Sequence, residues 1–273
     1  MAHPDLPGSL ILTERHGAVT RLVLNAPGSL NPLSDAMLAA LTTALDRIAQ
    51  DATTRVVILA GAGKAFCAGH DLREMQAARA QSDKGAAYFL DLFTRCGALM
   101  QRLPALPQPV IAEVHGIATA AGCQLVASCD MAVAAEGTRF GVNGVNIGLF
   151  CSTPMVALTR NLPRKQAFEL LTTGEFISAT RARELGLVNR VVPPEALTAE
   201  TLALAQTVAA KLTAAVKIGK RAFYDQIGLP LEAAYAQTAA VMAENMLWRD
   251  TEEGIQAFLE KRAPDWQAPA TST

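Results

Sequence analysis

The sequence predicts an α/β fold followed by a helical C-terminal portion, and three patterns support this prediction. Short apolar runs that read as buried strands, such as Arg55–Ala60 and Val110–Val114, alternate with segments of helical periodicity through the first two-thirds of the chain. Each of these two runs ends at a glycine. After Val192 only helical patterns remain. This order of elements is typical of layered α/β domains.

The elements expected in the α/β part are separated by loops rich in glycine and proline. Ser34 is expected to cap a helix, because a serine side chain accepts hydrogen bonds from the free amides at a helix start. Pro104, Pro107 and Pro109 are expected to separate a long helix from the next strand. The expected elements are strands Leu10–Thr13 and Ala18–Leu24 around the turn His16-Gly17, a loop Asn25–Pro32, a helix from Ser34 to about Gln50, strand Arg55–Ala60, helices Leu72–Ala80 and Gly85–Leu103, strand Val110–Val114, a helix from about Ala121, and strands Met131–Ala135 and Leu187–Val192.

The C-terminal portion is expected to contain four helices, about Glu195–Lys211, Ala214–Ile227, Leu231–Trp248 and Thr251–Lys261. A tail that contains proline and threonine, Ala263–Thr273, is expected to be mobile. We therefore divide the chain into an α/β core with the candidate site, residues 1–195, and a helical C-terminal region, residues 196–273.

Composition limits the classes of function. The 273-residue chain has a formal net charge of −1 with dispersed basic residues, which argues against a nucleic-acid surface. Its five cysteines form no C-x-x-C pair, so we expect reduced thiols and a cytoplasmic protein. The four histidines show no ligand spacing, so no metal site is expected. We also expect no secretory signal and no membrane span.

A first glycine-containing segment, residues 61–72, follows a predicted strand and precedes a predicted helix. Its sequence is Gly-Ala-Gly-Lys-Ala-Phe-Cys-Ala-Gly-His-Asp-Leu. Loops in this position bind ligands in many α/β folds, although a tight turn that only starts a helix is the alternative. A phosphate-binding loop is excluded, because G-x-x-x-x-G-K-[ST] is absent and Phe66 stands where G-x-G-x-x-G requires glycine.

A second segment, residues 116–130, contains Ala120-Ala121-Gly122-Cys123 at the start of a predicted helix. Its full sequence is Gly-Ile-Ala-Thr-Ala-Ala-Gly-Cys-Gln-Leu-Val-Ala-Ser-Cys-Asp. Free N–H groups and the positive end of the helix dipole lie at such a terminus. They can stabilise an oxyanion, and one such donor contributes roughly 3 kcal/mol in acyl chemistry.

The two segments, in this order, resemble the signature segments of the crotonase family of enoyl-CoA hydratases and isomerases. The resemblance runs from the loop at Asn25 to the ending Phe258-Leu-Glu-Lys-Arg262. It implies a superhelix of ββα turns followed by a helical trimerisation region, and hence a homotrimer or a hexamer. It also implies a CoA thioester as substrate or ligand, with no further cofactor.

The resemblance further implies an oxyanion hole for the thioester carbonyl. The two donors would be the backbone amides of Ala68 and Ala121, although the family usually has glycine at the second position. The residues lining the substrate would be Ala68, Gly69, His70, Asp71 and Ala121. Near the C-terminus, Lys261 matches a lysine that can approach a CoA phosphate, and a solvated basic helix end is the alternative.

The residues matching the two carboxylates of the family's hydratases are Gln124 and Gly144. Hydration requires a base that takes a proton from water and an acid that delivers one to the α-carbon. A glutamine amide can hold a water but takes no proton near neutral pH, and glycine has no side chain. A divergent branch of the family shares this combination and the runs Ala-Gly-Cys-Gln-Leu-Val-Ala-Ser-Cys-Asp and Gly-Leu-Phe-Cys-Ser-Thr-Pro.

Other side chains are candidates to replace the missing carboxylates. His70 titrates in the right range, but a histidine beside a turn is more often structural. Cys151 could act as a nucleophile if a helix start acidified its thiol, whereas a buried inert cysteine is the simpler interpretation. Asn143 and Asn146 can bind water or substrate without acid–base chemistry. Glu113 and Asp130 lie beside the two segments and are expected to have surface or strand-end roles.

Three functional hypotheses follow. The first is an enzyme of the hydratase/isomerase type that polarises a thioester with the two amides. The second is a regulatory acyl-CoA-binding protein with little or no turnover. The third is an isomerase or thioesterase that uses His70 or another base. The identity of the acyl chain is not encoded in any motif.

Overall fold

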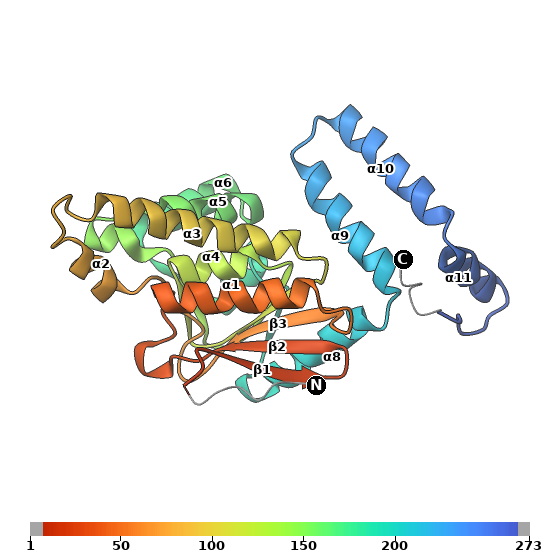
Figure 1. The fold of residues 1–273 in the computed structure, drawn as a ribbon, viewed down its shortest axis with the longest axis horizontal. Helices are drawn as coiled ribbons and strands as arrows, with labels where there is room; N and C mark the ends of the chain where they lie inside the picture. The colour runs from red at the N-terminus through yellow and green to blue at the C-terminus, as the bar shows by residue number, and fades with distance from the viewer. Residues whose placement is uncertain (1–7, 267–273) are drawn as a thin grey trace.

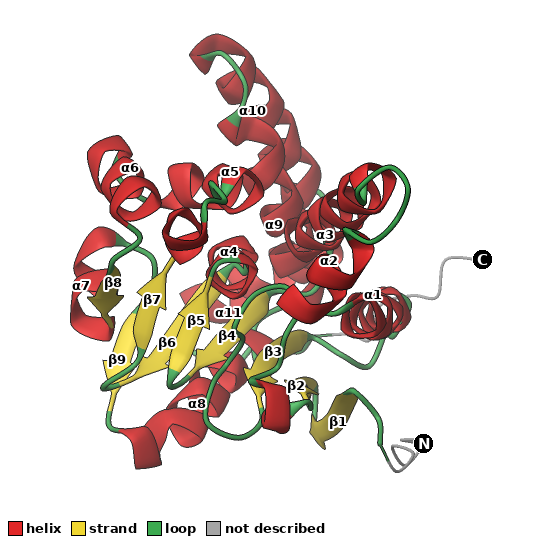
Figure 2. Ribbon diagram, turned by 90° about the vertical axis from the view of Figure 1, so that its left-hand side faces the viewer, coloured by secondary structure: helices red, strands yellow, loops and turns green. Residues whose placement is uncertain are grey.

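The computed structural model describes residues 8–266 and contains two β-sheets with helices packed around them (Figures 1 and 2). The strands are β1 Ile11–His16, β2 Val19–Leu24, β3 Val56–Gly61, β4 Val110–Val114, β5 Ile117–Thr119, β6 Met131–Ala135, β7 Arg139–Gly141, β8 Phe176–Ser178 and β9 Arg190–Val192. The helices are α1 Asp35–Ala49, α2 Leu72–Ala78, α3 Ala86–Ala105, α4 Ala121–Ser128, α5 Ser152–Asn161, α6 Arg164–Thr173, α7 Ala179–Leu185, α8 Leu197–Ala209, α9 Thr213–Ile227, α10 Leu231–Met246 and α11 Arg249–Leu259. Short 3₁₀ turns occur at Pro27–Ser29, Asn143–Ile147 and Pro194–Ala196.

The larger sheet has the strand order β1-β2-β3-β4-β6-β9. Only the N-terminal hairpin, β1 with β2, is antiparallel; the other four pairings are parallel. Alternate side chains of the central strands point to opposite faces of this sheet. One set packs against α1, α3 and α4 in the main core, and the other packs against α8 (Figure 2). The prediction of an α/β layer arrangement is therefore confirmed.

A second, three-stranded sheet of order β5-β7-β8 adjoins the first. Strand β5 pairs with β7 in parallel, with Thr119 opposite Gly141, and β8 pairs with β7 antiparallel. Sequence analysis missed this sheet, because strands of three residues are too short to show an alternating apolar pattern. This sheet matters for the candidate site because β5 leads directly into α4 and so fixes where that helix starts.

The helices that were predicted agree with the structure to within a few residues except at Pro104, whereas α5, α6 and α7 were not predicted from the sequence. Ser34 caps α1 as predicted, and its hydroxyl accepts the N–H of Met37 at 3.1 Å. Helix α3, however, continues through Pro104 to Ala105, so Pro104 does not separate it from β4. Proline has no N–H, so it removes one hydrogen bond from the helix. In the last turn this loss is tolerated, because the carbonyls at the end of a helix lack helical partners in any case.

The C-terminal helices divide into one that belongs to the core and three that do not. Helix α8 lies beyond the expected boundary at residue 195, yet it covers one face of the larger sheet. Helices α9, α10 and α11 extend away from the core (Figure 1). Among residues 8–266, no single helix is long and apolar enough to cross a bilayer. The segments 194–209 and 213–227 reach the required length and hydropathy only when taken together, and the chain bends by 101° between them.

A buried lysine joins α9 to the core. The ammonium group of Lys220 donates to Asp130 Oδ2 at 2.7 Å and to the carbonyl oxygens of Leu103 and Gln108 at 2.8 and 2.9 Å. The Tyr224 hydroxyl donates to the other Asp130 oxygen at 2.7 Å. Removal of one partner from such a buried pair leaves an uncompensated charge, so this contact fixes the start of the C-terminal extension. Asp130 therefore has a structural role directly before β6, which agrees with the expected strand-end role, but its side chain pairs with a buried lysine and does not lie on the surface.

Candidate functional site

The two glycine-containing segments lie side by side. Cys67 and Ala118 form a parallel β-bridge, in which the Cys67 N–H donates to Ile117 O at 3.2 Å and Thr119 N–H donates to Cys67 O at 3.1 Å. A side chain at Gly69 would come within 3.0 Å of the Ala120 methyl group and 3.4 Å of the Ala121 nitrogen. The structure thus brings together the two segments that were predicted, from the sequence, to share one site.

The start of α4 is held in an unusual backbone conformation. Ala120, the residue before the helix, has φ 49° and ψ −119°, a region that non-glycine residues rarely adopt. Both ends of this residue are fixed: its N–H donates to Gly141 O at 2.9 Å, and its carbonyl accepts the N–H of Gln124 at 3.0 Å. This turn presents the N–H of Ala121, which is the first helical residue and has no acceptor among residues 8–266.

The other expected donor, Ala68, is already engaged. Its N–H donates to the carbonyl oxygen of Leu30 at 3.0 Å. Leu30 and Asn31 both have positive φ, 65° and 52°, and Asn31 is fully buried. The Asn31 amide donates to Ala62 O and Ala65 O, both at 2.8 Å, and its Oδ1 accepts the N–H of Ala26. A ligand oxygen at Ala68 would have to share this N–H with Leu30 or displace Leu30 from it.

Gln124 lies one helical turn after Ala121, on the same side of α4. Its side chain is 3% exposed, and Oε1 has no hydrogen-bond partner among residues 8–266. No partner for the amide nitrogen is found there either. Buried polar groups are normally paired, so this carboxamide is an exception that needs an explanation.

His70 and Asp71 complete the first segment. The His70 ring packs edge-on against Phe93 of α3, with ring centroids 5.6 Å apart, and Nδ1 lies 3.3 Å from Leu33 O. Since a carbonyl only accepts, Nδ1 carries the proton, and Nε2 is a buried acceptor without a partner among the described residues. Burial lowers the pKa of His70 below 6.5. Asp71 instead caps α2 by accepting the N–H groups of Arg73 and Glu74.

Gly144 sits in the turn after β7, near the second segment. The Thr119 hydroxyl donates to Asn143 Oδ1 at 2.6 Å and links this turn to the residue before Ala120. A Cβ at Gly144 would lie 2.4 Å from Leu149 O and 2.8 Å from Cys151 Sγ. The main chain thus fills the place where a side chain would begin, which the sequence could not reveal.

Several other candidates have structural roles. Burial raises the pKa of the Cys151 thiol, which argues against a nucleophilic thiolate. All five cysteines are free and buried. Glu113 accepts from Arg21 at 2.6 Å and from Thr198 at 3.0 Å, and so ties the sheet to α8. Asn146 lies 3.4 Å from Gly174 O. Within residues 8–266, no three His, Cys, Asp or Glu side chains gather in a way that could hold a metal ion.

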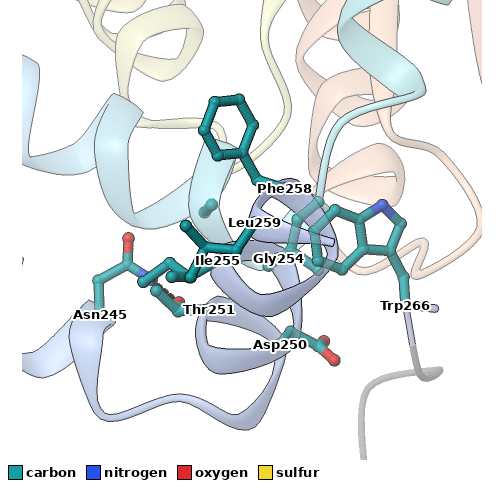
Figure 3. A pocket seen from close by; sticks show the side chains of 10 residues that line it. Asn245, Asp250, Thr251, Gly254, Ile255, Phe258, Leu259 and Trp266 are labelled. Carbon is teal, nitrogen blue, oxygen red and sulfur yellow. Dashed lines mark hydrogen bonds between the residues drawn. The ribbon is translucent and has the colours of Figure 1, made fainter. Parts of the chain in front are cut away.

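A separate, mostly apolar pocket of about 370 Å³ lies among the C-terminal helices (Figure 3). It is lined by Leu212, Ala215, Asn245, Asp250, Thr251, Gly254, Ile255, Phe258, Leu259 and Trp266. Lys261, the predicted CoA-phosphate ligand, follows α11 in this region and is exposed. In Figure 1, α11 lies on the opposite side of the molecule from α2, which begins next to the first segment. Lys261 is therefore remote from the two segments within one chain.

Comparison with known proteins identifies the class. The family model described as enoyl-CoA hydratase/isomerase matches residues 14–269. The chain therefore belongs to this family, the crotonase family, and the predicted fold class is confirmed. A crystal structure of an enoyl-CoA hydratase from Mycobacterium smegmatis is 54% identical, covers 94% of this chain and 98% of its own, and superposes with a TM-score of 0.90.

Further relatives narrow the resemblance to one branch of this family. Enoyl-CoA hydratase domain-containing protein 3 of Xenopus laevis is 46% identical, over 94% of this chain and 85% of that protein. The crystal structure of the human protein of this name is 42% identical, covers 94% of this chain and all of its own, and has a TM-score of 0.89. The resemblance to this branch is confirmed.

The predicted cytoplasmic location is contradicted by the same relatives. The enoyl-CoA hydratase domain-containing protein 3 sequences of Xenopus laevis, Danio rerio, rat, mouse and human are all named as mitochondrial. The prediction was based on reduced cysteines. Reduced thiols indicate a reducing environment and cannot identify which compartment provides it.

Proposed function

We propose that this protein binds CoA thioesters where its two glycine-containing segments meet, polarises the carbonyl, and is a poor hydratase. The observation that carries this proposal is the uncommitted N–H of Ala121, at a buried helix start beside Gly69. Such a donor in a low-dielectric site stabilises developing negative charge on an oxygen. The Ala68 N–H is the second donor once the thioester oxygen competes with Leu30.

The absence of a proton-transfer pair supports the second half of the proposal. Gln124 cannot act as a base near neutral pH, and Gly144 offers no side chain. His70 is a weak substitute, because burial lowers its pKa and so makes the imidazole a weaker base. We therefore favour acyl-CoA binding with slow or no turnover over an isomerase or thioesterase based on His70.

We also propose a homotrimer, or a dimer of trimers, for the assembled protein. Helices α9 to α11 expose large apolar side chains, among them Leu247 at 87% and Phe258 at 82%. A second exposed apolar group lies elsewhere, around Phe150 and Phe168. Two different apolar faces on one chain favour a head-to-tail contact, which closes into a ring. In such a ring, Lys261 lies at the contact between subunits and can approach a ligand bound to the neighbouring subunit. A protein that is monomeric at micromolar concentration would contradict the proposed trimer.

A panel of acyl-CoAs, measured in parallel for binding and turnover, tests the proposed function. Butyryl-CoA should bind more tightly than its thioether analogue S-butyl-CoA, because only the thioester has a carbonyl for the two amides. Crotonyl-CoA hydration, followed by loss of enoyl absorbance, should be slower than in a two-glutamate hydratase, since each positioned acid or base contributes roughly 10²–10⁴-fold. Equal affinity for butyryl-CoA and S-butyl-CoA would contradict the proposal. Hydration of crotonyl-CoA as fast as in a two-glutamate hydratase would also contradict it.

A further inference from the structure

We propose that Gln124 makes this site selective for acyl groups that carry a hydroxyl near the thioester, over saturated or enoyl groups of the same length. This inference rests on the proposed function, because it assumes that the thioester carbonyl is held by the Ala121 N–H. It concerns only which acyl group the site selects. The observation behind it is Gln124, a 3% exposed residue whose buried Oε1 lacks a partner among residues 8–266.

A second glutamine shows why Gln124 is unusual. Gln108 Oε1 also lacks a partner among the described residues, but its amide nitrogen donates to Ile48 O at 2.9 Å, and its backbone carbonyl accepts from Lys220. Gln108 is thus fixed as part of the structure. The Gln124 side chain, 3% exposed against 0% for Gln108, has no such anchor among residues 8–266. A structural role therefore explains Gln108 and does not explain Gln124.

The position of Gln124 fits recognition of the acyl group near its carbonyl. Three residues along an α-helix correspond to a rise of about 4.5 Å, so Gln124 lies roughly that far along α4 from Ala121. Side chains on a helix lean toward its N-terminus, which directs the carboxamide toward the Ala121 end. A substituent on the first carbons beyond a carbonyl at Ala121 falls within this span.

The chemistry of the carboxamide selects a hydroxyl. Oε1 only accepts and the NH₂ group only donates, so a ligand group that both donates and accepts satisfies the side chain. A hydroxyl does both, whereas a methylene or an alkene carbon does neither. A buried polar group left unpaired weakens binding, so the loss for an unsubstituted acyl group is on the order of tenfold in affinity.

The experiment compares butyryl-CoA, crotonyl-CoA and each enantiomer of 3-hydroxybutyryl-CoA by calorimetry on the full chain, with the ligands recovered and checked for conversion. We expect one hydroxyl enantiomer to bind about tenfold more tightly than butyryl-CoA. In Gln124→Met, which keeps the length of the side chain, this preference should disappear. Gln206→Met, on the exposed side of α8, should retain it.

A ligand-side control keeps the test independent of the variant's folding. 3-Fluorobutyryl-CoA has nearly the size of the hydroxyl compound but cannot donate a hydrogen bond, so it should bind wild type no better than butyryl-CoA. Equal binding of all the ligands overturns the inference and indicates that Gln124 holds a water instead. A preference that persists in folded Gln124→Met also overturns it. No binding of any CoA thioester refutes the proposed function itself.

Discussion

The backbone N–H of Ala68 donates to the carbonyl oxygen of Leu30 at 3.0 Å, so one of the two proposed oxyanion donors is occupied by the protein itself. This contact comes from the loop before α1, which no signature segment includes. The loop owes its shape to Asn31, whose buried amide bonds three backbone groups. The stability of the loop and the availability of the hole are thus set by the same few residues.

Asn31→Asp should strongly destabilise the protein. The substitution replaces the Nδ2 group that donates to Ala62 O and Ala65 O with a carboxylate oxygen, which faces two acceptors in a buried place. A buried charge without a partner, added to two lost hydrogen bonds, is expected to lower the free energy of unfolding by about 3–5 kcal/mol. Urea denaturation measures this change.

Asn25→Asp is the matched control. Asn25 is only half-buried, and its amide makes one hydrogen bond, to Ser9 O at 2.9 Å. A loss of about 1 kcal/mol is expected for it. Equal losses for the two variants would show that Asn31 does not hold the loop.

Ala121→Pro should weaken thioester binding, and circular dichroism must first show that the variant folds, because a following proline disfavours the φ of 49° and ψ of −119° at Ala120. Proline is tolerated at the first position of a helix, but it has no N–H to donate to the thioester oxygen. The expected loss is roughly tenfold in affinity for butyryl-CoA, because the removed hydrogen bond goes to a neutral carbonyl in the bound state. Ala179→Pro makes the same change at the first position of α7 and should bind normally. Full affinity in a folded Ala121→Pro protein would show that the hole is assigned wrongly.

The sequence predicted that the two glycine-containing segments lie together, because glycine marks where the backbone turns, and this juxtaposition is present; their role as a binding site stays a prediction. The approach of Gly69 to Ala121 was expected and is present. The Leu30 carbonyl was not predicted, because a backbone acceptor leaves no trace in residue identity. The second sheet was missed because three-residue strands carry no periodic pattern. The anchor Lys220 was missed since a lysine in a helix ordinarily faces solvent.

Gly144→Ala should lower stability even though alanine is the smallest possible addition. Its Cβ would meet Leu149 O at 2.4 Å, so the main chain must shift, at a loss of about 1–3 kcal/mol. Gly219→Ala, with nothing within 4 Å inside α9, should gain about 0.5–1 kcal/mol. Thermal denaturation of the two variants measures these changes, and a Gly144→Ala protein as stable as wild type would contradict the prediction.

This crowding also changes what can be expected from restoring carboxylates. Gln124→Glu alone should raise crotonyl-CoA hydration above wild type but leave it below a two-glutamate enzyme. Adding Gly144→Glu should give no further gain, because the new side chain has no room to begin. A double variant with the rate of a two-glutamate hydratase would show that the loop 148–151 yields easily.

His70 should make the protein less stable in mild acid. Burial holds its folded-state pKa below 6.5, so the unfolded chain binds more protons between these two values. Stability therefore falls as pH drops below about 6.5, by at most about 1.4 kcal/mol per pH unit from this group, and is unaffected by it above. His70→Gln should lose this part of the slope in melts between pH 5 and 7.5. An unchanged slope would mean that the ring is not buried as described.

The pocket among the C-terminal helices has a practical consequence for spectroscopy. The chain has two tryptophans, and both belong to this region: Trp248 precedes α11, and Trp266 lies against Gly254 on the pocket wall. Intrinsic fluorescence therefore reports on α9 to α11 and on whatever covers them, while the sheets and the hole remain optically silent. Emission that changes on dilution while circular dichroism stays constant would follow assembly alone, without any label.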